Sequence, residues 1–147
     1  MLAVMRKTMS MGVLLGAALV LMSVFGCDVM APEANSGVDK DRLGAVAIEL
    51  DALVLDHVNC LEGDKTDWKY FNVDEEMDVA VTFAFDEPNA GGTVVLRRAT
   101  GEEINRMKFR PGKRMQYVFK AIPGHYYLEI FCEAYESEYT IEVSRPL

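Results

Sequence analysis

The feature that most constrains the fold of this chain is a strict alternation of large apolar residues with small or polar residues from Met77 to Asp86. Successive side chains of a β-strand point to opposite faces, so a period of two predicts a strand with one buried face. A helix would instead repeat its apolar residues every three or four positions. The residues on the apolar face are Met77, Val79, Val81, Phe83 and Phe85.

Shorter segments with the same period lie on both sides of this strand. We expect them at about residues 52–60, 68–73, 93–98, 103–110, 114–120, 125–133 and 138–143, while residues 43–50 fit either a short strand or a helical turn. Clusters of glycine and proline, such as Pro88 to Gly92, separate them and indicate turns. Seven to eight short strands without an amphipathic helix predict an all-β fold, an antiparallel β-sandwich spanning residues 45–147.

Pro111-Gly112 predicts a hairpin between the segments 103–110 and 114–120. Opposite residues of an antiparallel pair share a face, so Phe109 should face Met115 across a three-residue loop. Such a loop places a residue in the left-handed region, and Gly112 or Lys113 would take that position.

The N-terminus reads as an export signal. Arg6 and Lys7 precede an apolar run, residues 11–25, which has the length of a signal-peptide core and is short for a membrane span. The run ends in Val24-Phe25-Gly26-Cys27, which resembles a bacterial lipobox with a bulky residue at Phe25. This resemblance implies a signal helix within residues 1–26, cleavage before Cys27, and a lipid such as palmitate on the Cys27 thiol.

The same resemblance implies a lipid-anchored protein of the bacterial cell envelope or periplasm. Residues 27–44 are polar, with Pro32 and Gly37 among them, and we expect a flexible tether there. Asp28 is similar to the inner-membrane retention signal of enterobacterial lipoproteins, but other lineages sort differently, so inner and outer membrane both stay open. Ordinary secretion and an uncleaved anchor are the alternatives to lipidation.

Cys60 and Cys132 are the two cysteines that remain once Cys27 is assigned to the lipid. Exported proteins favour disulfides, and strand parity points both thiols inward, so we predict a Cys60–Cys132 bridge. The closed loop would contain 73 residues, for which the chain-entropy treatment gives about 4 kcal/mol.

Charge and composition exclude several functions. After residue 26 the chain has 13 basic and 23 acidic residues, a net charge of −10, which argues against nucleic-acid binding. The acidic loops around Glu62, Asp64 and Asp67 and at residues 74–78 could bind calcium, but neither has the spacing of a defined motif. We therefore expect solvated turns, no metal and no cofactor.

Three motifs resemble those of the bacterial pre-peptidase C-terminal domain. They are residues 64–73, with Lys69 where an aromatic residue is usual, residues 93–101, and residues 123–130 followed by 139–143. The resemblance implies a jelly-roll-like β-sandwich that serves as a small binding or stabilising module, without catalytic residues. His57 and His125 stand in no nucleophile context, and Gly-x-Ser-x-Gly is absent, so we expect no enzymatic activity.

Two sets of residues are candidates for binding a protein or an anionic polysaccharide of the envelope. One is a basic hairpin in which Arg110 would face Arg114; positive charge there could also simply protect a sheet edge. The other comprises aromatic residues on the face opposite Tyr126. An enzyme or inhibitor with a polar pocket, and a purely structural subunit with an apolar patch, remain as alternatives. The candidates are Arg106, Lys108, Arg110, Arg114, Tyr127 and Phe131.

Lipidation can be tested by metabolic labelling with palmitate. We expect label on the wild-type protein and none on Cys27→Ala, because the acylated atom would be the Cys27 thiol. Cys60→Ala serves as the control and should stay labelled. Label that persists on Cys27→Ala would contradict the assignment.

Overall fold

The computed structural model describes residues 37–109 and 112–146. The predicted signal peptide and Cys27 therefore lie outside the described residues. In the described part, the chain contains one 3₁₀ turn and no helix with the length and hydropathy of a membrane span. The elements are η1 (Arg42–Gly44), β1 (Val46–Ala47), β2 (Ala52–Asn59), β3 (Thr66–Val73), β4 (Met77–Phe85), β5 (Gly91–Arg98), β6 (Glu103–Lys108), β7 (Met115–Ala121), β8 (Gly124–Ala134) and β9 (Glu136–Ser144).

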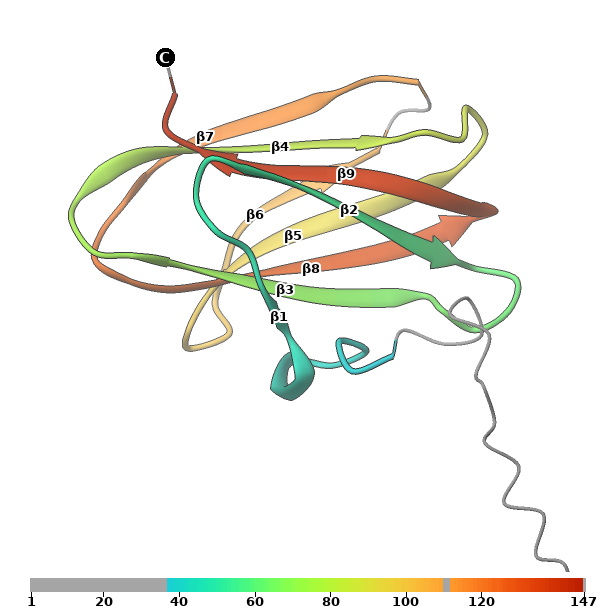
Figure 1. Ribbon diagram of the computed structural model, residues 1–147, viewed down its shortest axis with the longest axis horizontal. Coiled ribbons are helices and arrows are strands. Elements are labelled where there is room, and N and C mark those ends of the chain that lie inside the picture. Colours follow the sequence, from blue (N-terminus) through green and yellow to red (C-terminus); the bar gives the residue numbers. More distant parts are fainter. Residues whose placement is uncertain (1–36, 110–111, 147) are drawn as a thin grey trace, which may run out of the picture.

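The strands form two sheets that lie face to face, as Figure 1 shows. Sheet A has the order β1-β3-β8-β5-β6 and sheet B has the order β2-β9-β4-β7. Neighbouring strands are antiparallel except β1 and β3, which run parallel. The predicted all-β sandwich is confirmed.

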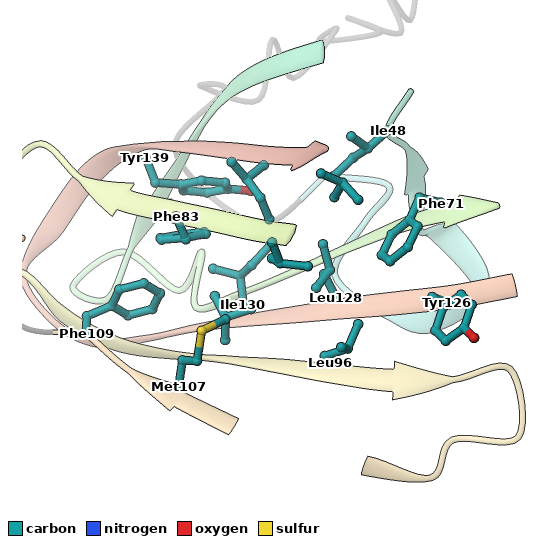
Figure 2. Packing of buried hydrophobic residues seen from close by; sticks show 14 of the residues in the cluster. Ile48, Phe71, Phe83, Leu96, Met107, Phe109, Tyr126, Leu128, Ile130 and Tyr139 are labelled. Carbon is teal, nitrogen blue, oxygen red and sulfur yellow. The ribbon is translucent and has the colours of Figure 1, made fainter. Parts of the chain in front are cut away.

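The core lies between the inner faces of the two sheets, where apolar side chains alternate along each strand (Figure 2). The face predicted for residues 77–85 is buried from Val79 onward. Phe83 lies at the centre of an aromatic group, with its ring centroid 5.1 Å from that of Tyr139 and 4.3 Å from that of Phe109. The strict alternation in the sequence thus produces the packing that joins the sheets.

The predicted hairpin between residues 103–110 and 114–120 is wrong. β6 pairs with β5 in sheet A, whereas β7 pairs with β4 in sheet B, so the chain crosses between the sheets after Phe109. Met115 therefore faces Phe83 rather than Phe109. The reason is that the alternation of side chains shows which residues of a strand face inward, but it does not show to which of the two sheets the strand belongs. Gly112 does adopt a left-handed conformation, with φ of 66°, as predicted.

Part of the predicted tether packs against the domain. Among residues 37–44, the Asp39 carbonyl accepts a hydrogen bond of 2.8 Å from the Trp68 backbone N–H, and the Asp39 side chain is buried against Lys69. Asp41 caps the following 3₁₀ turn by accepting from the backbone N–H of Leu43 at 2.9 Å. We call residues 37–48 the N-terminal strap. Its last part contains β1, and the Ile48 N–H that follows β1 donates a hydrogen bond to the Tyr70 carbonyl.

The Cys60–Cys132 disulfide is present, with Cα atoms 5.5 Å apart. Cys60 follows β2 of sheet B, and Cys132 lies in β8 of sheet A. The bridge therefore links the two sheets at one end of the sandwich, between residues 72 positions apart in the sequence.

Removal of this bridge should destabilise the protein without changing its fold. We expect the double variant Cys60→Ala/Cys132→Ala to lose about 2–5 kcal/mol of unfolding free energy, because the unfolded chain regains the freedom that the loop removes. Urea denaturation of both forms, with and without reductant, measures the loss. A variant as stable as the oxidised wild type would contradict the expectation.

Candidate functional site

Four rings form a cluster on the outer face of sheet A. Trp68 and Tyr70 project from β3, and His125 and Tyr127 project from the neighbouring strand β8. The centroids are 4.6 Å apart for Tyr70 and His125, 4.7 Å for His125 and Tyr127, and 6.2 Å for Trp68 and Tyr127. All four are half-buried, so ring surface remains accessible. We call these residues the aromatic platform.

Charged side chains border the platform. The Arg42 guanidinium of the strap lies 5.6 Å from the Tyr127 ring centroid, within range of a cation–π contact. On the β5 side, Arg97 donates from Nε to the Glu129 carboxylate at 2.7 Å.

Of the predicted aromatic candidates, Tyr127 belongs to the platform. Phe131 lies on the same outer face, opposite Thr66, and is also half-buried.

The basic candidates come from two different sheets. Arg106 and Lys108 lie on β6 of sheet A, whereas Arg114 precedes β7 of sheet B; Arg110 is outside the described residues. Arg106 pairs with Glu103 at 2.8 Å, and Arg114 pairs with Glu142 at 2.8 Å. The predicted basic hairpin therefore does not form, and acidic partners pair with two of its cations. Binding by these residues stays a prediction.

A second candidate region is polar. It is a cleft of about 980 Å³ that is lined by residues of the N-terminal strap and of β2. At its base is Lys69, only 2% exposed, on the inner face of β3. Its ammonium donates to Asp39 of the strap and to Asp56 of β2. Burial alone would lower the pKa of Lys69, but these hydrogen bonds hold the pKa above its ordinary value.

Asp67 lies beside this pair and is also 2% exposed. Burial raises the pKa of Asp67 to about 8, and the hydrogen bond donated by the Tyr139 hydroxyl, at 2.6 Å, lowers it only in part. Burial likewise raises the pKa of Tyr139 well above its usual value. Asp67 is therefore largely protonated at neutral pH, and it is buried in contact with Tyr139 of the opposite sheet rather than in a solvated turn as predicted.

The geometry of this cluster argues for a lysine rather than a metal ion as its cation. Carboxylate oxygens of Asp39, Asp56 and Asp67 lie within 4.8 Å of one another, close enough to share a cation. The Lys69 ammonium already contacts two of them and supplies the positive charge. Of the acidic residues considered for calcium, Asp64 and Asp67 line the cleft, and Glu62 is exposed.

The sequence reasoning missed this cluster, although a signal was present. Lys69 has the same parity as Phe71 and Val73, so a strand with those residues inside must also place Lys69 inside. A lysine in that position requires carboxylate partners. Its unusual place in an otherwise aromatic motif was visible, but Asp39 was assigned to the tether, which concealed one of the partners.

With the geometry described, known proteins can be compared. No protein-family model matches the chain, and no curated protein matches it either. A solved structure, the pre-peptidase C-terminal domain of collagenase from Bacillus anthracis, covers 67% of this chain and 93% of its own, with 24% identity and a TM-score of 0.59. The chain has the fold of this domain. The fold expected from the sequence motifs is thereby confirmed.

Two other solved structures are more distant. A carbohydrate-binding module of lichenase 5A from Cellvibrio mixtus has 12% identity and a TM-score of 0.41 over 67% of this chain and 91% of its own. A periplasmic inhibitor of g-type lysozyme from Aeromonas hydrophila has 8% identity and a TM-score of 0.39 over 67% and 95%. At these scores the likeness supports no argument about what this chain binds.

The buried carboxyl of Asp67 should make stability depend on pH. Its folded pKa lies above its unfolded value of about 3.9, so between these values the folded state retains a proton that the unfolded state has lost. Stability from this group is full below about pH 4 and falls as pH rises to about 8, by roughly 1 kcal/mol per pH unit. The asparagine of Asp67→Asn stays neutral and can still accept a hydrogen bond from Tyr139. The stability of this variant relative to wild type should therefore increase as pH rises.

Urea midpoints between pH 5 and pH 9 test this expectation. The exposed Asp74→Asn is the matched control, since it removes one carboxyl without touching the cluster. Parallel pH profiles for wild type and Asp67→Asn would show that Asp67 does not titrate as described.

Proposed function

We propose that this protein is a non-enzymatic binding module of the bacterial cell envelope, anchored through a lipid on Cys27. Its aromatic platform contacts a polysaccharide or protein partner outside the membrane. The observation that supports the proposal is the cluster of Trp68, Tyr70, His125 and Tyr127 on the outer face of sheet A.

Several physical features make this face suited to binding. Aromatic rings bind through large, rigid surfaces at a small cost in side-chain entropy, and they accept sugar rings or apolar groups against their faces. Arg42 and the Arg97–Glu129 pair provide hydrogen-bonding groups at the margin. Sheet A holds the four rings and the Arg97–Glu129 pair, so little ordering of these groups is needed when a ligand binds.

The cleft raises the alternative of an enzyme, since convergent polar groups and a shifted pKa are typical of active sites. In this cleft the polar groups hold parts of the fold together. Lys69 connects the strap, β3 and β2, and Asp67 connects β3 to Tyr139 of β9. His57 also lines this cleft, with Nδ1 3.7 Å from the Asp64 carboxylate. A binding function therefore accounts for the geometry without a reaction.

Co-sedimentation with insoluble polysaccharide tests the proposal. Purified peptidoglycan sacculi and cellulose serve as probes for the full-length protein in detergent. We expect Trp68→Ala and Tyr127→Ala each to weaken binding about tenfold, a change of roughly 1.4 kcal/mol, because each removes one ring surface. Affinity purification from envelope extract covers the case of a protein partner.

Tyr135→Ala is the matched control. This tyrosine is exposed between β8 and β9, away from the platform, and its loss should leave binding unchanged. If platform and control variants retain the same ligands with the same affinity, the platform is not the binding surface. A partner lost only when Cys27 is replaced would instead indicate that the anchor, rather than this face, determines the interaction.

A further inference from the structure

Strand β2 has an open edge and carries exposed leucines. It lies at the end of sheet B and, among the described strands, it pairs only with β9. Sheet edges are commonly protected by charged side chains because an open edge can accept another strand. The outward residues of β2 include two leucines, Leu53 and Leu55, which are 59% and 67% exposed.

The backbone of β2 offers hydrogen-bonding groups on this open side. The His57 N–H bonds to the Asp56 side chain at 2.9 Å and the Asn59 N–H to the Asp64 carbonyl at 2.7 Å, so neither points toward β9. Alternate residues of an antiparallel strand direct their amides to opposite sides. The amide groups of Leu53 and Leu55 therefore also point away from β9, in the position to receive an added strand.

The acidic cleft adjoins the C-terminal part of this edge, at Asp56 and His57. Asp56 and His57 of β2 form one wall, and the strap, with Asp39 and Val46, forms the other. Eight carboxyl groups of the described residues line the cleft, and seven remain once the largely protonated Asp67 is set aside, against Lys69 and His57 as the basic groups. Three of those at the far end are exposed: Asp86, Glu136 and Glu138. The surroundings of the edge are strongly negative.

From this edge and its charge, we propose that β2 is a docking site for an extended, cationic segment of a partner protein, which adds as a fifth strand to sheet B. Side chains of such a strand alternate between the two faces. Apolar residues opposite Leu53 and Leu55 would cover these leucines, and lysines or arginines at the alternate positions would lie on the face of Asp56, toward the cleft. The segment therefore alternates apolar and basic residues.

The charge of the cleft also decides against a second copy of this chain as the occupant. Pairing of β2 with β2 would bring two acidic clefts together, and like charges across an interface cost several kcal/mol. A cationic segment would instead be attracted by the negative field of the cleft, and it would associate faster for the same reason.

A synthetic peptide provides the test, independent of the aromatic platform. The probe is an acetylated and amidated octapeptide of alternating lysine and valine, titrated onto the full-length protein in detergent. A peptide of the same composition in the order Val-Val-Lys-Lys, repeated, keeps the charge and loses the alternation. We expect the alternating peptide to bind at least tenfold more tightly, and its affinity to fall with added salt.

Proline variants distinguish the edge from general charge attraction. Leu55→Pro removes an edge N–H that β9 does not use and should weaken the alternating peptide at least tenfold while retaining the fold. Val118→Pro is the matched control on β7, the other edge of sheet B; Val118 is 46% exposed and by the same alternation its amide points away from β4. Urea denaturation confirms that both variants fold.

Three results would overturn the proposal. They are equal binding of the two peptides, equal weakening by Leu55→Pro and Val118→Pro, and a wild-type dimer that Leu55→Pro dissociates. The last would show that β2 pairs with a second copy despite the charge.

Discussion

The buried ammonium of Lys69 is the interaction on which the arrangement of this domain depends. It joins three separate parts of the chain, because Lys69 belongs to sheet A, Asp56 to sheet B and Asp39 to the N-terminal strap. Removing one member of such a cluster leaves a buried charge without its partner, which is costly. The strap is therefore part of the domain.

The same cluster explains why one side of the sandwich is polar. Inner-face positions of β2 and β3 near this end hold Asp56, Asp67 and Lys69 instead of apolar residues, so the sheets are not sealed there by a hydrophobic layer. The cleft opens at this point, next to the uncovered edge of β2. The outer face of sheet A carries the aromatic platform on β3 and β8. The molecule thus has two chemically different surfaces, each suited to a different kind of partner.

The predicted hairpin shows where reasoning from parity ends. Parity placed Phe109 and Met115 on one shared face, and in the structure Phe109 is buried and Met115 packs against the core. A hairpin and a crossing between sheets both satisfy this pattern, since both bury the same side chains. Pro111-Gly112 marks a turn in either case. The grouping of the basic residues depended on the hairpin and failed with it.

By itself, the sequence determined the strands, their inner faces and the inward cysteine pair, because period-two alternation is a local property that any sandwich preserves. The export signal, with Cys27, is likewise written in consecutive residues, and it stays a prediction. The tertiary structure decided which strands are neighbours and therefore which polar residues meet. Asp39, Asp56, Lys69 and Tyr139 are far apart in the chain, and the rings of β3 and β8 come together only across a sheet. Such contacts depend on strand order, which the side-chain period does not contain.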